Sequence, residues 1–220
     1  MSGMNGFTHN CENNKVRWQE FKKSLSDSSF SYAQIAMIWD FYVTHSFSGS
    51  SGQERKLTEY GWGSGEKDLK TVEKELMLSA GIAKLCCIRS KGIDKTLSAN
   101  DFVNSEICVE HPRIILRQNY TLTVDENETI KFAGGGENRI VSLFRHIRNA
   151  FAHSNTYFFD NGNMLLEDKE GSKVTAKILI KQQTLLDWIA IIDKNQRYYV
   201  LVDPCAECKS KENENGQIDS

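Results

Sequence analysis

The clearest chemistry in this sequence lies in a short run of polar side chains. The run from Glu137 to His153 reads ENRIVSLFRHIRNAFAH, and it has no acidic residue after Glu137. A local patch of positive charge on a nearly neutral protein is the kind of feature that can hold a phosphate group. The side chains that form this patch are Arg139, Arg145, His146, Arg148, Asn149 and His153.

An amphipathic helix must position these side chains. Apolar residues in the run follow the i, i+3, i+4, i+7 rule, which places them on one buried stripe and leaves the polar residues outside it. The stripe consists of Ile140, Leu143, Phe144, Ile147, Ala150 and Phe151. A simpler interpretation stays open, because a charge run on a helix is usually a solvated face. A histidine in the last turn also often does no more than favour the negative end of the helix dipole.

The end of this segment resembles the signature of the HEPN family. Arg148 to His153 reads RNAFAH, in which a polar residue follows the Arg and four residues separate it from the His. The family pattern is an Arg, four to six residues, and a His. The following HSNTYFFDNGNMLLED is similar to the hairpin of plasmid and phage-defence members. The resemblance extends over Glu137 to Asp193, and the half of the chain before it is similar only as a helical complement.

This resemblance implies a metal-independent endoribonuclease without a cofactor, which cleaves RNA as a homodimer and serves as a toxin or a phage-defence effector. Its catalytic residues would be Arg148, His153 and Asn149, and Arg145 and His146 would extend the RNA path. A His can accept the 2′-hydroxyl proton near neutral pH, and an Arg can hold the phosphate oxygens. The products would carry 2′,3′-cyclic phosphate and 5′-hydroxyl ends. An antitoxin or another regulator is the further partner expected.

The spacing of the two catalytic candidates limits how they can meet. Arg148 and His153 are five residues apart, about 140° around a straight helix, so they do not share a face. Asn149 and His153, four residues apart, do share one. Either the last turn unwinds and brings His153 toward Arg148, or two copies of the helix meet and pool their residues. The second arrangement fits the homodimers of the family.

One position departs from the family. Some toxin members carry a Tyr two residues after the His, which a partner nucleotidyltransferase modifies. This chain has Asn155 at that position, and its nearest Tyr is Tyr157. Neutralisation by that route is therefore not expected here.

The predicted fold is mainly α-helical: a HEPN-like bundle with a small β-hairpin or strand addition after the motif helix. We expect disordered ends over 1–14 and 205–220 and a single domain over 15–200. Within the domain, we expect a helical part over 15–118, the motif helix over 137–153, and a hairpin with a C-terminal helix over 156–193. Gly134 to Gly136 lack the Lys and Ser/Thr of a phosphate-binding loop, which makes them a linker.

The longest regular pattern before the motif predicts a helix over Asp68 to Ser90, in which Gly81 is a mild weakness. Cys86 and Cys87 lie inside this run and are expected to be buried thiols of the core. A weaker alternation after Tyr120 predicts a hairpin that includes Ile130 and Phe132.

Cys205 and Cys208 form one CxxC pair, and no second pair of ligands with zinc-site spacing occurs in the sequence. A structural zinc site requires four ligands, so a metal is not expected.

The totals describe a soluble globular chain of 220 residues, 40% hydrophobic and 25% charged, with a formal net charge of −2. The strongly basic total that would suggest stable nucleic-acid binding is absent, so any contact with RNA must rest on a local positive field. No run approaches the roughly 18 apolar residues of a membrane span, and the polar start is unlike a signal peptide. A cytoplasmic location is therefore expected.

Two functional hypotheses stay open at this point. The first is the ribonuclease, favoured by an intact set of Arg, Asn and His residues that a scaffold does not need. The second is a non-catalytic HEPN-like module that binds RNA, a nucleotide or a protein, favoured by the lack of a basic surplus. A serine hydrolase is unsupported, because the Gly-x-Ser-x-Gly motif does not occur.

Overall fold

The computed structural model describes residues 28–48, 53–83, 85–88, 112–118, 137–159 and 162–200, together with the backbone of four short strands at 15–16, 107–108, 122–124 and 130–132. Its centre is a five-stranded mixed sheet with the order β2-β4-β9-β8-β7. The strands are β2 (Cys86–Ile88), β4 (Arg113–Arg117), β7 (Thr156–Phe158), β8 (Asn163–Glu170) and β9 (Lys173–Lys181). β2 and β4 run parallel, and the other neighbours in this sheet are antiparallel.

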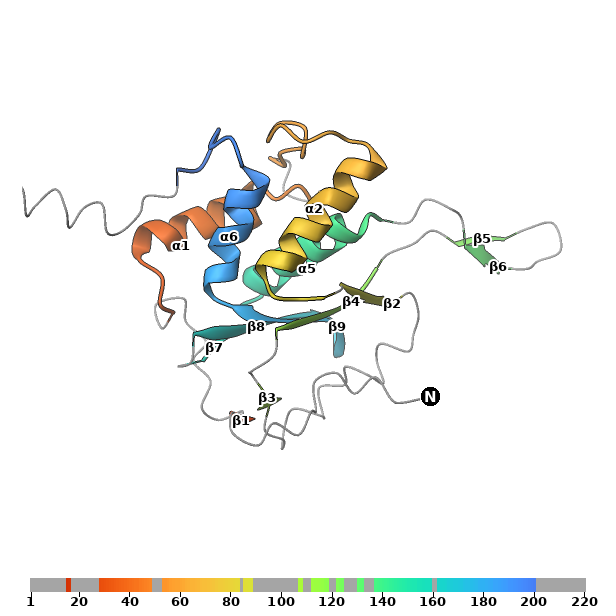
Figure 1. Cartoon of the computed structure of the whole chain (residues 1–220). Coiled ribbons are helices and arrows are strands. Elements are labelled where there is room, and N and C mark those ends of the chain that lie inside the picture. Colours follow the sequence, from red (N-terminus) through yellow and green to blue (C-terminus); the bar gives the residue numbers. More distant parts are fainter. Residues whose placement is uncertain are drawn as a thin grey trace, which may run out of the picture.

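The helices form a single layer on one face of this sheet (Figure 1). They are α1 (Tyr32–Trp39), the π-helix η3 (Asp40–Thr44) that continues it, α2 (Glu66–Ser79), α5 (Arg139–Ala152) and α6 (Gln183–Ile192). No helix in the described part of the chain has the length and apolar character needed to cross a bilayer.

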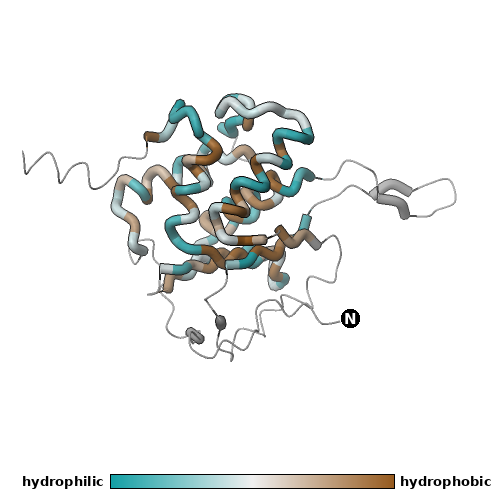
Figure 2. Tube along the Cα trace, in the orientation of Figure 1, coloured by the Kyte–Doolittle hydropathy of each residue, from teal (hydrophilic) through white to brown (hydrophobic). Residues whose placement is uncertain are grey.

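The core lies between the helix layer and the sheet. Figure 2 shows hydrophobic residues concentrated in the sheet and alternating with hydrophilic ones along the helices. At its centre the ring of Phe144 on α5 stacks on Tyr42, with centroids 5.5 Å apart. Trp188 of α6 is fully buried, and its indole Nε1 donates to Leu76 O of α2 at 2.9 Å. The first contact holds α5 to η3, the second joins α6 to α2, and α5 itself packs against β8.

The expectation of a mainly α-helical HEPN-like bundle is wrong, because the centre of the structure is a mixed sheet. The hairpin, expected as a small addition, supplies β7 and β8, and β9 joins β8 to β4. The pairing of Ile114 with Ile178 connects segments 64 residues apart along the chain, as 178 − 114 shows. Local patterns do not reveal such a pairing, and a short apolar run cannot be told from a buried helix by periodicity alone.

The part expected to be helical, 15–118, contains α1, η3 and α2 but also β2 and β4 of the sheet. Gly81 shows where the sequence pattern misled. Gly81 has a φ of +68° and ends α2 instead of lying within a longer helix. The amides of Gly81 and Ile82 donate to Leu78 O and Met77 O, at 3.1 and 2.9 Å, which is the Schellman motif that glycine favours.

Cys86 and Cys87 consequently belong to the edge strand β2 and are only half-buried, so the expected helical, fully buried thiols are also wrong.

Four expected elements are confirmed in outline. The motif helix is α5, the hairpin after it is β7 and β8, and the C-terminal helix is α6. β5 (Leu122–Val124) and β6 (Ile130–Phe132) form the antiparallel pair expected there, and β1 (Lys15–Val16) pairs with β3 (Ile107–Cys108). The ends at 1–14 and 205–220, with Cys205 and Cys208, lie outside the described residues.

Candidate functional site

Helix α5 and its C-cap carry every candidate residue, and both ends of the helix are well defined. Asn138 is the N-cap, and its side-chain oxygen accepts a hydrogen bond from the Ile140 amide at 2.8 Å. The apolar stripe is buried, with Leu143 and Ile147 fully enclosed. The polar residues therefore project along the margins of the buried stripe, where the neighbouring strands decide what each one meets.

Arg145 has a dedicated partner. Its guanidinium bonds both carboxylate oxygens of Glu137, with Nε at 2.7 Å from Oε1 and Nη2 at 2.9 Å from Oε2. Both side chains are largely enclosed, with 16% and 14% of their surface exposed. A two-point arginine–carboxylate pair in such a setting is strong and fixes both groups. Arg145 is thus neutralised within the fold, which does not leave its charge open to an RNA chain.

His146 is fully buried and bonded at both ring nitrogens. Its Nδ1 lies 2.6 Å from Asp168 Oδ2, and its Nε2 lies 2.7 Å from Arg117 O. Arg145 Nη2 also lies 3.3 Å from His146 Nε2, so the ring is held on both sides by groups of the fold. His146 therefore joins α5 to the sheet and cannot reach an RNA substrate directly.

Asp168 is the residue that organises this part of α5. Burial alone raises its pKa, but hydrogen bonds from His146, Asn149 and Thr175, with the charge of His146, hold it below the ordinary 3.8. The carboxylate is consequently ionised at neutral pH. Asn149 Nδ2 donates to the same oxygen, Oδ2, at 3.2 Å. The amide group of Asn149 is thus engaged in the buried network.

Arg148 differs from its neighbours on the helix. It makes no hydrogen bond or ion pair with the described residues, although it is half-buried. Its Nε is buried and has no acceptor. An enclosed donor without an acceptor costs about 1–3 kcal/mol. The Nε of Arg139 on the same helix is also unpaired, but Arg139 bonds Glu73 through Nη2, whereas Arg148 has no such second bond to the described residues. A ligand with acceptor oxygens would use this guanidinium.

His153 is exposed and stands at the C-cap of α5. Its amide still donates to Asn149 O at 2.9 Å, so the helix stays intact up to this residue. Ser154 follows with a φ of +53°, and the amides of Ser154 and Asn155 close a Schellman motif on Phe151 O and Ala150 O. The last turn therefore does not unwind toward Arg148, and about 140° of rotation separates the two residues on one chain.

The sequence predictions divide into two groups at this helix. Arg145, His146 and Asn149 meet in one buried network, together with Glu137 and Asp168, which the sequence alone did not single out. Arg148 and His153 stay outside that network. One signal for Asp168 was present: it shares a strand face with Met164 and Leu166, and an acid in an apolar row needs a buried partner.

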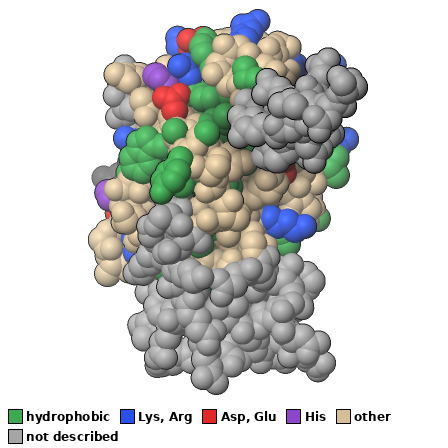
Figure 3. Space-filling view, turned by 90° about the vertical axis from the view of Figure 1, so that its left-hand side faces the viewer, with side chains coloured by type: hydrophobic (Ala, Val, Ile, Leu, Met, Phe, Trp, Pro, Cys, Tyr) green, Lys and Arg blue, Asp and Glu red, His purple; other side chains and the backbone are tan. Residues whose placement is uncertain are grey.

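A second polar cluster lies near α1 and has structural partners throughout. Tyr199 accepts a hydrogen bond from Arg55 at 2.7 Å and donates one to Asp40 at 2.8 Å. The guanidinium of Arg55 also lies over the Tyr198 ring, 4.1 Å from its centroid. Viewed from the side where α1 lies, Figure 3 shows hydrophobic side chains beside acidic and basic ones. These groups satisfy one another and join η3 to the chain after α6.

Within the described residues, no three His, Cys, Asp or Glu side chains gather as a metal site would require. No family model, curated protein or solved structure matches the chain. The arrangement on α5 is therefore the basis on which a function has to be argued.

Proposed function

We propose that this protein is a metal-independent endoribonuclease with an Arg-x4-His motif of the HEPN type, in which Arg148 and His153 carry the chemistry. The motif stands on a sheet-based fold and not on the helical bundle first expected. The expected role is that of a toxin or phage-defence effector that acts on RNA in the cytoplasm and is restrained by an antitoxin or another regulator.

One observation carries the proposal: the two motif residues are the ones that the fold leaves unused. Arg145 and His146 lie on the same helix and have partners for every charge. Arg148 has no acceptor among the described residues, and His153 is exposed at the helix end. A free guanidinium and an accessible imidazole are what cleavage of RNA by its own 2′-hydroxyl requires.

The reaction would proceed without a covalent enzyme intermediate. His153 takes the proton of the 2′-hydroxyl as the new bond between the 2′-oxygen and phosphorus forms. The bond to the 5′-oxygen breaks, and that oxygen leaves with a proton from water. Arg148 donates hydrogen bonds to the phosphorane oxygens, where negative charge accumulates. The products are a 2′,3′-cyclic phosphate and a 5′-hydroxyl.

The geometry favours an active site shared by two chains. On one chain Arg148 and His153 point about 140° apart around an intact helix end. In a dimer with two-fold symmetry, the α5 ends of both copies would meet across the axis. Each site would then take Arg148 from one chain and His153 from the other. Asn149, held by Asp168, would position the end of the helix.

The first test is cleavage of a mixed RNA pool in EDTA by the parent chain, Arg148→Ala and His153→Ala, with analysis of the product ends. We expect cyclic phosphate ends from the parent and at least a hundredfold slower cleavage from each variant. Lys181→Ala removes an exposed cation at the end of β9 and serves as the control, which should cut like the parent. If the folded parent leaves every RNA intact, the chain is a binding module and not a nuclease.

A second test separates a shared site from one within a single chain. Arg148→Ala and His153→Ala chains are mixed, dissociated and reassembled. A shared site predicts that each mixed dimer regains one complete site, which restores about a quarter of the parent activity. A site built within one chain predicts no recovery. Recovery by mixing cannot arise from contaminating nuclease, because both separate preparations are inactive.

A further inference from the structure

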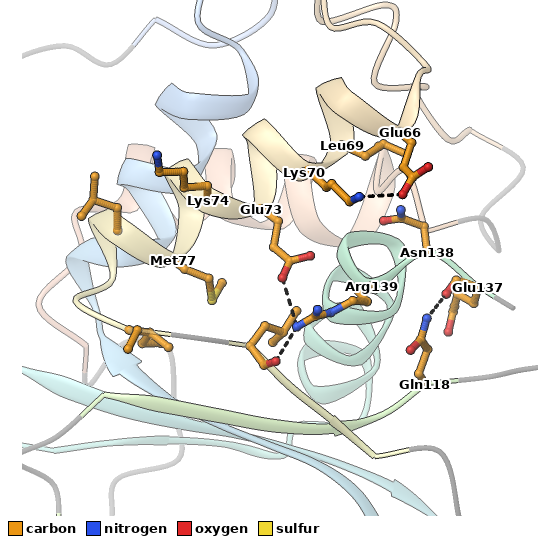
Figure 4. Close-up of a pocket in the computed structure, with 14 residues that line it drawn as sticks. Glu66, Leu69, Lys70, Glu73, Lys74, Met77, Gln118, Glu137, Asn138 and Arg139 are labelled. Atoms are coloured by element: carbon orange, nitrogen blue, oxygen red, sulfur yellow. Dashed lines mark hydrogen bonds and ion pairs between the residues drawn. The ribbon is translucent and has the colours of Figure 1, made fainter.

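A cavity lies at the opposite end of α5 from the proposed active site. It has a volume of about 660 Å³, within the usual range for pockets that hold a small ligand. Its walls come from α2, from the chain that follows α2, from Gln118 after β4, and from the first residues of α5. Figure 4 shows these elements around it, with Arg139 reaching from α5 toward Glu73 of α2.

One side of the cavity is apolar. Met77, Ile82 and Leu85 line it and are themselves buried, which makes them a firm surface that belongs to the core. Leu78 also lines the cavity, but 75% of its surface is exposed. A large aliphatic side chain left in solvent at the rim of an apolar surface gains free energy when a ligand covers it.

The charges of the cavity do not cancel completely. Its three acidic side chains each have a cation: Glu66 pairs with Lys70 at 2.7 Å, Glu73 with Arg139 at 3.0 Å, and Glu137 with Arg145 at 2.7 Å. Lys74 also lines the cavity, and it has no acidic partner among the described residues. The open charge of the cavity is therefore a single positive one, at an exposed position on α2.

We propose that this cavity binds a small amphipathic anion, an aliphatic carboxylate, with its charged end at Lys74 and its chain against Met77, Ile82 and Leu78. The single unpaired cation selects one negative charge, and the apolar wall accepts a hydrocarbon body. A doubly charged, fully polar ligand such as a free phosphate would leave the apolar wall exposed, so it is a poorer fit. This site is separate from the ribonuclease proposal and does not depend on it.

Calorimetric titration of the full chain with decanoate, kept below its micelle concentration, tests the proposal. We expect saturable one-to-one binding. Two matched probes separate the contributions: propionate keeps the charge without the chain, and decyltrimethylammonium keeps the chain with the opposite charge. Both are expected to bind at least about tenfold more weakly than decanoate.

Three variants locate the site. Lys74→Glu should raise the Kd for decanoate at least about fivefold, and Leu78→Gln should raise it about fivefold. Both positions are exposed, so neither change should disturb folding, which circular dichroism can verify. Lys67→Glu makes the same charge change on α2 outside the cavity and should shift the Kd by less than about twofold. Absence of decanoate binding, equal binding of the ammonium probe, or an equal effect of Lys67→Glu would each overturn the proposal.

Discussion

Helix α5 carries basic side chains along its whole length, and those near its start differ from those near its end in what they contact. Arg139 bonds Glu73, Arg145 bonds Glu137, and His146 bonds Asp168. Arg148 and His153, in the last turn and at the cap, make no such pair within the described residues. The same helix thus holds one group of basic residues that fastens it and another that serves no structural bond.

The difference teaches how to separate structural from functional basic residues on one amphipathic helix. A paired, enclosed charge has its cost of burial offset by its partner and gives the helix a fixed position. A half-buried arginine without an acceptor has nothing that offsets its cost of burial, so a bound ligand is the simplest explanation for it. Stability and activity should therefore respond to different residues of α5, and the variants below test that division.

The largest expected loss of stability follows from Asp168→Ala. The change leaves the His146 ring buried without its carboxylate, and removing one member of a buried pair costs about 3–5 kcal/mol. Urea unfolding followed by tryptophan fluorescence measures the loss. Glu75→Ala, an exposed carboxylate on α2, is the matched control and should change the free energy of unfolding by less than about 0.5 kcal/mol. A loss below about 1 kcal/mol for Asp168→Ala would mean that the pair does not fasten α5.

The same carboxylate gives a pH dependence with a definite sign. The pKa of Asp168 lies below its ordinary 3.8 because the bonds from His146, Asn149 and Thr175 outweigh burial. A lowered pKa contributes stability that is present above 3.8 and is lost as the pH falls through the folded-state pKa. Unfolding free energies measured from about pH 5 downward should therefore fall more steeply for the parent than for Asp168→Asn. Equal slopes would show that another group governs acid unfolding.

A smaller loss is expected from Glu137→Gln, at the start of the helix. The change removes the charge from the two-point pair with Arg145, while the carbonyl oxygen of the new amide still accepts one hydrogen bond. We expect a loss of about 1–2 kcal/mol, since hydrogen bonds to charged groups are worth about 1.5–3 kcal/mol. A double-mutant cycle with Arg145→Gln gives the coupling directly. Coupling near zero would place Arg145 with the unpaired cations instead.

The sequence predicted the helix and the local strands well, because their signals are local. The apolar stripe of α5 and the hairpin of β7 and β8 each depend on residues that are close together in the sequence. The order of strands in the sheet could not be predicted, since β2 pairs with β4 and β4 with β9 through residues distant in the sequence. Which basic residues of α5 are paired within the fold could not be predicted either. Nothing in the sequence distinguishes Arg145 from Arg148. The difference appears only in the folded structure, where Glu137 pairs with Arg145.

The smallest expected loss of stability belongs to the motif itself and bears most directly on the comparison. Arg148→Gln removes a buried donor for which the described residues supply no acceptor, and His153→Gln changes an exposed cap residue, so neither should lower the free energy of unfolding by more than about 0.5 kcal/mol. Loss of the unpaired donor itself favours the folded state. If these residues carry the chemistry, both variants are at least as stable as the parent in urea yet lose cleavage. Urea curves and cleavage rates on the same preparations decide it. A loss of 2 kcal/mol or so from Arg148→Gln would reveal a structural partner and would return Arg148 to the group of basic residues that fastens α5.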